Sequence, residues 1–262
     1  MSTTNDTMVI SEIRKALESE DSRLGEVWRG DERGLSHAEI AEELGVETSN
    51  FVWNNLRFAR AIETGDLPTA PSVIRSCLSA VRGFLKRNRP SFSPRTIEVL
   101  AARIRELEAR LDSSETVELE DRTIREREQD VEALDVPGIY VYTLPHYYRN
   151  PLQPADGEFN AGKTLMKVGM SENDVIKRFR TQQRDTVLPE DPWLLRIYKC
   201  SADTRETEKS FHDFLRAADH RQQGGRSVGT EWFLTSLRFL DQIARDKGLE
   251  VLFRIEDGAS EG

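Results

Sequence analysis

The sequence predicts an α+β protein with an all-helical N-terminal half and a small C-terminal domain of mixed strands and helices. Up to about residue 134, apolar residues recur at the three- and four-residue spacing of amphipathic helices. After Pro137, short runs rich in Ile, Val and Tyr alternate with helical stretches, a pattern typical of half-buried strands. A length of 262 residues also exceeds the usual size of one domain.

The first part of the helical half carries clear local signals. Residues 9–19 predict a short amphipathic helix, and a polar stretch follows to about Gly34. Two helices around a turn are then expected. Ser36 and Glu39 form a capping box at the start of the first helix, and Gly45 stands where the chain must turn.

The second part of the helical half is more charged. Residues 71–88 predict a helix with a basic end. Residues 93–111 predict another, in which Ser93 is the N-cap and Pro94 the first helical residue. Apolar positions are sparse in residues 115–134, so we interpret this helix as a solvated spacer or a weak coiled coil.

Charge is segregated along the chain. The net charge is −9, and residues 112–135 hold ten acidic and three basic residues. Residues 163–184 hold six basic and two acidic residues. A positive stretch of this kind can bind phosphate groups although the whole chain is acidic.

The strands and helices of the C-terminal half define the expected domain boundaries. Strands are predicted at 138–144, 164–170, 193–200 and 249–255, and helices at 171–183, at 203–217 and before Gly248. A polar, Gly-rich loop leads to residues 229–234, which precede the last helix. We therefore place a helical module at 1–90, a charged spacer at 91–135, the mixed domain at 136–256 and a disordered tail at 257–262.

Membrane and disulfide-rich secreted proteins are not indicated. No run approaches the roughly 18 apolar residues that a membrane span needs, and the N-terminus lacks a secretory signal pattern. Cys77 and Cys200 lie far apart and outside any CxxC pattern, so we expect reduced thiols in a cytoplasmic protein. The four histidines show no zinc-ligand spacing.

An ordered set of residues suited to phosphodiester hydrolysis lies beyond Pro137. In chain order the set is Gly138-Ile139-Tyr140, Lys167-Val168-Gly169, Arg178, Glu208 with His212, and Glu231-Trp232-Phe233. It resembles the GIY-YIG nuclease superfamily, and most closely the phage- and restriction-type branch in which Lys replaces the tyrosine of YIG. The resemblance covers roughly residues 136–255 and implies a mainly antiparallel sheet flanked by helices.

The resemblance implies a role for each polar member of the set. Tyr140 is the candidate general base, and nearby cations must assist its proton loss because a free tyrosine has a pKa near 10. Lys167 supplies positive charge, and Arg178 can donate two hydrogen bonds to phosphate oxygens. Glu208 would hold one Mg²⁺ (or Mn²⁺), an ion that often takes only one or two protein carboxylates. His212, one turn later, would contact the substrate or the water shell of the metal.

Each of these residues also has a structural interpretation. Tyr140 would be an ordinary strand residue, and Arg178 would pair with Asp174 four residues earlier. Glu206 rivals Glu208 as the metal ligand, and His212 alone would be structural. We expect core packing for Trp232 and Phe233.

The set departs from the superfamily in two respects. The loop between the first two strands is longer than usual; its His146, Tyr147, Tyr148, Arg149 and Asn160 form either a substrate-contacting insertion, which we favour, or a solvated excursion. The further His or Tyr that follows the arginine in the superfamily has no clear equivalent. Gln182 lies nearest, and its role stays unassigned.

Residues 38–56 resemble a helix-turn-helix, with Ile40, Leu44, Val46 and Phe51 at the inward positions. The second helix would present Thr48 and other polar residues to DNA. Three glutamates on the first helix, and Asn54 at a position that is usually apolar, favour the alternative of a plain packing unit. The basic helix end (Arg82, Lys86, Arg87, Arg89) is either a phosphate-contacting patch or a solvated terminus. The candidate nucleic-acid contacts are Ser49, Asn50, Asn55, Arg57, Lys86, Arg87, Arg149, Lys163, Arg180 and Arg184.

Together these interpretations predict a metal-dependent endonuclease that cuts double-stranded DNA and is targeted by its helical module. Restriction, phage defence and mobile-element roles all fit, and the spacer is compatible with a homodimer. Two alternatives stay open: a non-catalytic DNA-binding regulator with a nuclease-like domain, and an RNA-directed nuclease.

Overall fold

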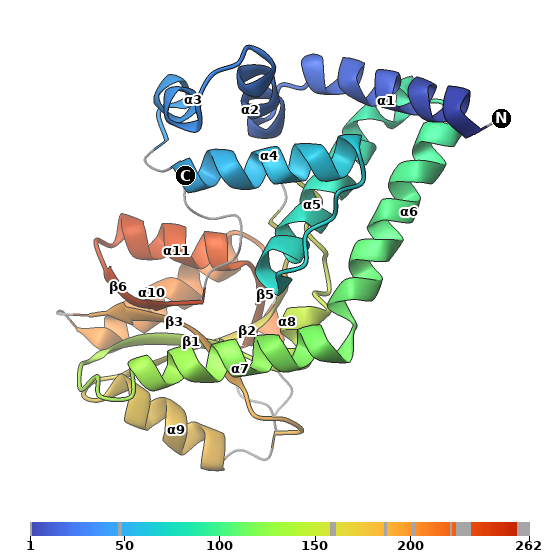
Figure 1. The fold of residues 1–262 in the computed structure, drawn as a ribbon. Coiled ribbons are helices and arrows are strands. Elements are labelled where there is room, and N and C mark those ends of the chain that lie inside the picture. Colours follow the sequence, from blue (N-terminus) through green and yellow to red (C-terminus); the bar gives the residue numbers. More distant parts are fainter. Residues whose placement is uncertain are drawn as a thin grey trace. The chain divides into compact units, whose positions relative to one another are not determined.

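The computed structural model describes residues 2–46, 49–157, 161–185, 188–200, 203–220, 222–223 and 232–255. The chain divides into two compact units, each with its own hydrophobic core (Figure 1). The helical unit extends to Glu120 and includes the short segment 155–157. The sheet unit comprises Asp121–Pro154 and Ala161–Ile255.

The helical unit is built around two long helices, α4 and α5. Its elements are α1 (Ser2–Glu18), α2 (Arg23–Glu32), α3 (His37–Leu44), α4 (Ser49–Glu63), α5 (Pro71–Asn88), a 3-10 turn (Arg89–Ser91), α6 (Pro94–Leu111) and the start of α7 (Ser114–Asp130). Ile62 of α4, with Cys77 and Phe84 of α5, is fully buried in its core.

Helix α2 occupies the stretch that the sequence predicts to be polar and irregular, so that prediction is wrong. Leu24, Val27 and Trp28 form its buried stripe. Gly25 and Gly30 obscure the helical signal, because glycine is a poor helix former. Close packing explains Gly30: a Cβ atom there would lie 2.7 Å from Cγ1 of Ile40 in α3.

Both ends of α3 form as predicted. The backbone N–H of Glu39 donates to the Ser36 hydroxyl at 3.3 Å, and the Glu39 carboxylate accepts from the Ser36 N–H at 2.8 Å, which completes the capping box. Gly45 ends α3 with a φ of 64°, a left-handed conformation that favours glycine. Ile40, Val52 and Leu56 pack together beneath the turn.

The expected spacer, residues 91–135, is not a separate solvated segment. Helix α6 buries Leu100 and Leu107 in the helical core, and the end of α7 buries Ile124 in the sheet unit. Glu128 of α7 accepts a hydrogen bond from the backbone N–H of Leu194 at 2.8 Å, and burial raises the pKa of this carboxyl. The few apolar residues of α7 therefore pack against the rest of the sheet unit.

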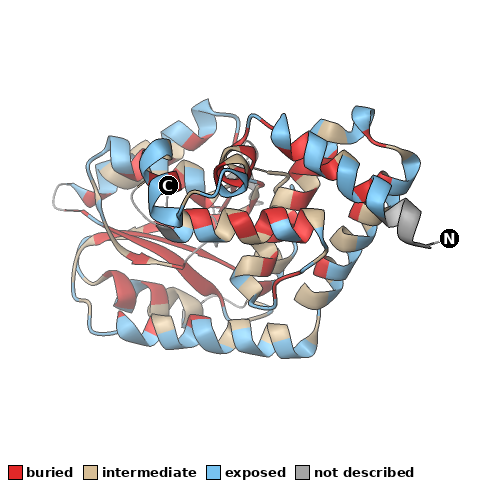
Figure 2. Ribbon diagram, turned by 45° about the horizontal axis from the view of Figure 1, so that its top comes forward, coloured by how far each residue is buried: buried red, intermediate tan, exposed pale blue. Residues whose placement is uncertain are grey.

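The sheet unit is an antiparallel sheet covered by helices, as predicted. Its elements are β1 (Gly138–Thr143), α8 (Pro145–Arg149), β2 (Thr164–Ser171), α9 (Val175–Asp185), β3 (Trp193–Lys199), α10 (Thr204–Ala217), β4 (Gln222–Gln223), β5 (Trp232–Thr235), α11 (Leu237–Asp246) and β6 (Glu250–Arg254). The strand order is β4-β5-β2-β1-β3-β6, and neighbouring strands are antiparallel. Helix α9 lies on one face, with α10 and α11 on the other (Figure 1). Figure 2 shows the central strands as largely buried.

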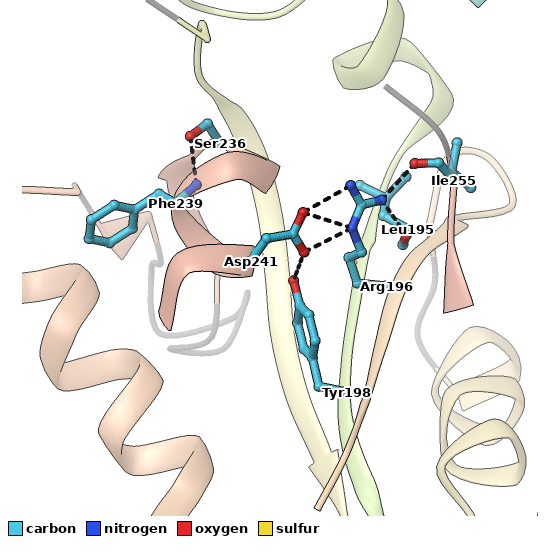
Figure 3. A network of polar contacts seen from close by, with 7 residues as sticks. All are labelled: Leu195, Arg196, Tyr198, Ser236, Phe239, Asp241 and Ile255. Carbon is cyan, nitrogen blue, oxygen red and sulfur yellow. Dashed lines mark hydrogen bonds and ion pairs between the residues drawn. The ribbon is translucent and has the colours of Figure 1, made fainter. Parts of the chain in front are cut away.

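A buried polar network joins β3 to α11 (Figure 3). Arg196 is 0% exposed; its Nε lies 3.1 Å from Oδ1 of Asp241, and its Nη1 donates to the carbonyl of Ile255 at 2.7 Å. The Tyr198 hydroxyl donates to Asp241 at 2.7 Å. Burial, followed by the charge of Asp241, raises the pKa of Tyr198 well above its ordinary value. The phenol therefore stays protonated and remains a donor.

The described helices and the cysteines agree with the expectations from composition. No helix in the described part of the chain is long and apolar enough to cross a membrane. Cys77 and Cys200 are both buried and are not joined in a disulfide. Burial raises the pKa of the Cys77 thiol to about 12, so it is a packing residue rather than a reactive thiol.

Candidate active site

Strand pairing places Tyr140 and Lys167 on one face of the sheet. Tyr140 pairs with Gly169 across β1 and β2, and Tyr142 pairs with Lys167. Residues two apart on a strand, and residues paired across strands, share a face. This face is the one that α9 covers, through Phe179, whose ring centroid lies 6.3 Å from that of Tyr140.

Tyr140 is buried, and its hydroxyl has a defined partner. The residue is 1% exposed, and its ring lies parallel to that of Tyr142 with the centroids 6.2 Å apart. Its hydroxyl donates to the Gln182 Oε1 atom of α9 at 2.8 Å. The residue that the sequence left without a role therefore contacts the candidate base directly.

Gly169 allows the Tyr140 ring to cross β2. A Cβ atom on Gly169 would lie 2.6 Å from both Cζ and the hydroxyl oxygen of Tyr140. Contacts under 3.0 Å require something to move, and the ring is already packed on both sides. The glycine of the Lys-Val-Gly motif is thus explained by packing: only a bare backbone lets the phenol reach over this strand.

Replacing Gly169 with alanine should therefore displace Tyr140. We expect a loss of about 1–3 kcal/mol in the free energy of unfolding, as for other overpacked cores. A double-mutant cycle with Tyr140→Leu isolates the cause, because the same alanine should cost much less once the ring is gone. Chemical denaturation of the four proteins measures this difference, and equal costs in both backgrounds would refute the packing explanation.

Helix α10 reaches the same strand from the opposite face. Nε2 of His212 lies 3.2 Å from the carbonyl oxygen of Val168, and the His212 ring packs against Phe233 with the centroids 4.9 Å apart. Because a carbonyl oxygen only accepts, His212 carries its proton on Nε2. About two turns earlier, Arg205 pairs with Glu172 at 3.4 Å.

Helical spacing places Glu208 between these two contacts. Arg205, Glu208 and His212 are spaced three and four residues apart, so they form one stripe along α10. The stripe follows residues 167–172, which we call the β2 end. Glu208 is partly buried in this stripe, whereas the rival Glu206 is exposed and lies some 200° away around the helix. Of the two glutamates, Glu208 is therefore the one on the side of α10 that approaches the β2 end.

The four predicted catalytic groups do not lie on a single face of the sheet. Tyr140 and Lys167 approach the β2 end from the α9 face, and Glu208 comes from the α10 face. The Tyr140 ring crosses Gly169 at the β2 end, and His212, one turn after Glu208, contacts the carbonyl of the preceding Val168. The described pairing of β2 with β5 stops just before this point, at Lys167 and Trp232.

Arg178 lies one helical turn before Gln182 on α9, so both side chains project from the same side of that helix. The Arg178 side chain is exposed and makes no hydrogen bond or ion pair with another described residue. Asp174 does not pair with it; its Oδ1 accepts from the backbone N–H of Lys177 at 2.8 Å and caps the helix. The simple surface pair that would have explained Arg178 is not formed.

Lys167 lies beside the tyrosine pair. It is 8% exposed, and its Nζ lies 5.7 Å from the centroid of the Tyr142 ring. Trp232 packs edge-on against the same ring, with the centroids 5.5 Å apart. Trp232 and Phe233 are buried core residues, as predicted.

The described acidic residues do not form a preformed metal cage. Among the described residues, no group of three or more His, Cys, Asp or Glu side chains is arranged to hold a metal ion. Glu208 fits the chemistry of Mg²⁺, which keeps most of its waters and accepts one or two protein carboxylates.

Two of the four candidate nucleic-acid contacts in the sheet unit are engaged in ion pairs. Arg149 pairs with Asp121 at 2.6 Å and stacks over Trp193 at 4.7 Å. Arg180 pairs with the buried Glu128 at 3.3 Å. Lys163 is half-buried, and Arg184 is exposed.

The candidate contacts in the helical unit divide in the same way. Lys86 pairs with Asp156, Arg87 pairs with the buried Glu20 at 2.7 Å, and Arg82 pairs with Glu108 at 2.6 Å. The basic end of α5 is thus largely neutralised within its own unit.

The candidate contacts on α4 are less engaged. Asn55 donates to the carbonyl of Phe51, Arg57 stacks over the half-exposed Trp53 at 4.5 Å, and Asn50 is exposed. The Ser49 side chain and Thr48 lie outside the described residues.

The long connection after β1 contains α8, and two of its aromatic residues lean on the sheet unit. Tyr147 and Tyr148 are half-buried and pack against the core, and Tyr148 meets the Trp193 ring with the centroids 5.5 Å apart. His146 of the same helix is exposed. Substrate contact by this segment stays a prediction. Asn160 and Glu231 lie outside the described residues.

Comparison with known proteins identifies one domain. Residues 139–247 match the T5orf172 domain family. This segment is less than half of the chain, and it contains every candidate catalytic residue from Tyr140 to His212. No curated protein and no solved structure matches the sequence.

Proposed function

We propose that this protein is a metal-dependent DNA endonuclease of the GIY-YIG type. The T5orf172 match supports a nuclease-type domain that acts on nucleic acid. The geometric support for the proposal is that the Tyr140 ring crosses Gly169 at the β2 end, where His212 and Arg205, the helical neighbours of Glu208, contact Val168 and Glu172. A phenol and a carboxylate that approach one strand from two faces can act on opposite sides of one phosphate.

In this proposal each side chain has one task. The Tyr140 oxygen takes a proton from the attacking water as the oxygen–phosphorus bond forms and the bond to the leaving oxygen breaks. Lys167 and Arg178 offset the negative charge that develops on the phosphate. Glu208 holds the divalent ion, which would stabilise the leaving oxygen and polarise the phosphate. Among the helical residues, Asn50 and Arg57 of α4 are the candidates for DNA contact.

The cleavage test compares two glutamates of α10. Purified wild-type protein with plasmid DNA and Mg²⁺ is expected to nick or linearise the plasmid. Glu208→Ala should lower the rate by about 10³-fold, as expected when transition-state charge loses its support. Glu206→Ala removes the same charge two residues away and should change the rate less than threefold. Equal losses in both variants would refute the role of Glu208.

The same assay separates the alternatives. Binding of DNA without cleavage under any metal condition would favour a non-catalytic regulator. Cleavage of RNA in preference to DNA would identify an RNA-directed nuclease. A role in phage defence, restriction or mobile-element biology is a further proposal. Plaque assays that compare cells expressing the wild type with cells expressing Glu208→Ala test the role in phage defence.

A further inference from the structure

We propose that Gln182 is a positioning residue that controls the proton on Tyr140 by reversing its side-chain amide. In the structure its Oε1 accepts from the phenol; after a half-turn of the amide its Nε2–H group would donate to the phenolate. This inference rests on the proposed function, in which Tyr140 is the base.

The present hydrogen bond opposes proton loss from Tyr140. A hydrogen bond that the neutral form donates stabilises that form against the charged one. The Tyr140 oxygen lies 2.8 Å from Oε1 of Gln182, and the tyrosine is 1% exposed, so water contributes little to the stability of a phenolate there. A partner that can only accept would hold Tyr140 protonated.

A carboxamide differs from a carboxylate because it carries both an acceptor and two donors. The two ends of the amide have nearly the same shape, so reversal needs little space. Gln182 is half-buried and lies one turn after the exposed Arg178. A phosphate bound by Arg178 would therefore arrive beside the amide that must turn.

The proton balance follows directly. Tyr140 releases its proton to solvent as the amide reverses, and the phenolate accepts a proton from the water that attacks phosphorus. The re-formed phenol donates again to Oε1, and the next turnover begins with release of that proton to solvent. Gln182 itself neither gains nor loses a proton.

Three variants test this role. Gln182→Glu keeps the shape and the acceptor but removes the donor, whereas Gln182→Met keeps the length and removes both. Gln183→Glu makes the same change of charge at the adjacent half-buried residue, whose Oε1 contacts Arg180. The chain has five tyrosines, so ¹³Cζ-tyrosine spectra are simple, and Tyr140→Phe assigns the signal.

We expect Tyr140 to begin ionising at lower pH in the wild type than in Gln182→Glu, with Gln182→Met between them and Gln183→Glu close to the wild type. Cleavage by Gln182→Glu should fall at least about tenfold in kcat near pH 7, with little change in KM, and its pH profile should move to higher pH. Each tenfold loss of kcat at a fixed pH corresponds to a displacement of the pH profile by one unit.

The NMR titration and the cleavage assay test two different claims. If Tyr140 does not begin to ionise earlier in the wild type than in Gln182→Glu, or if the two glutamate variants behave alike, the amide switch is overturned whatever the activity. If the NMR difference appears but the wild type cleaves no nucleic acid, the switch is retained and the endonuclease proposal falls.

Discussion

Replacing Arg178 with alanine is expected to lower DNA cleavage by about 10³-fold and to leave the fold intact. Removal of a cation that stabilises a transferring phosphoryl group typically costs 10³-fold or more. The Arg178 side chain is exposed and has no hydrogen-bond partner among the described residues, so its loss should change the free energy of unfolding by no more than about 0.5 kcal/mol. Single-turnover cleavage and thermal unfolding together measure the two effects.

The neighbouring Lys177 provides the matched control for Arg178. It is also exposed on the first turns of α9 and carries the same charge, so Lys177→Ala should cleave within threefold of the wild type. Arg178→Lys should restore little activity, because an ammonium group cannot form the forked pair of hydrogen bonds. A melted Arg178→Ala variant would instead make this arginine structural.

Replacing Asp241 with alanine should be the most destabilising change in the sheet unit. It would leave Arg196 fully buried without its counter-charge and remove the acceptor of the Tyr198 hydroxyl. Loss of one partner of a buried ion pair costs about 3–5 kcal/mol. Chemical denaturation followed by circular dichroism should show this loss.

Asp246 is the control for Asp241, since it lies on the same helix but is exposed and, within the described part of the chain, accepts from Gln242. Asp246→Ala should stay within about 0.5 kcal/mol of the wild type. If Asp241→Ala is equally mild, the network between β3 and α11 contributes little to stability, and water must reach Arg196 in the variant.

The local elements were predictable wherever short-range chemistry decides them. The capping box of Ser36 and the turn at Gly45 depend on a few neighbouring residues, and both were predicted. Helix α2 was missed because the packing of Gly30 against Ile40 outweighs the poor helix propensity of glycine. The role of α7 was missed because its few apolar positions gain their burial from another part of the chain.

The chain order of the candidate site was predictable, but its spatial arrangement was not. The resemblance to the GIY-YIG superfamily implied Tyr140, Lys167, Arg178 and Glu208. It did not show that the first two and the last approach β2 from opposite faces, because strand pairing decides this. Gln182 could have been selected from its position four residues after Arg178, since that spacing places both on one side of a helix.

The sequence overestimated how many basic side chains are available as phosphate contacts. Arg87 and Arg149 looked like free cations in the sequence, yet each pairs with a carboxylate, Glu20 and Asp121 respectively. Glu20 lies 67 residues from Arg87 along the chain. No local pattern records such a pairing, so a count of basic residues overestimates the charge that is available to DNA.

The most direct test of the central claim is a crystal structure of the Tyr140→Phe variant with a DNA duplex and Mn²⁺, located by its anomalous signal. We predict one ion bound by Glu208 and a single phosphate within hydrogen-bonding distance of both Lys167 and Arg178, facing the ring of residue 140. An ion bound elsewhere, or a phosphate that reaches Arg178 but not Glu208, would contradict the account.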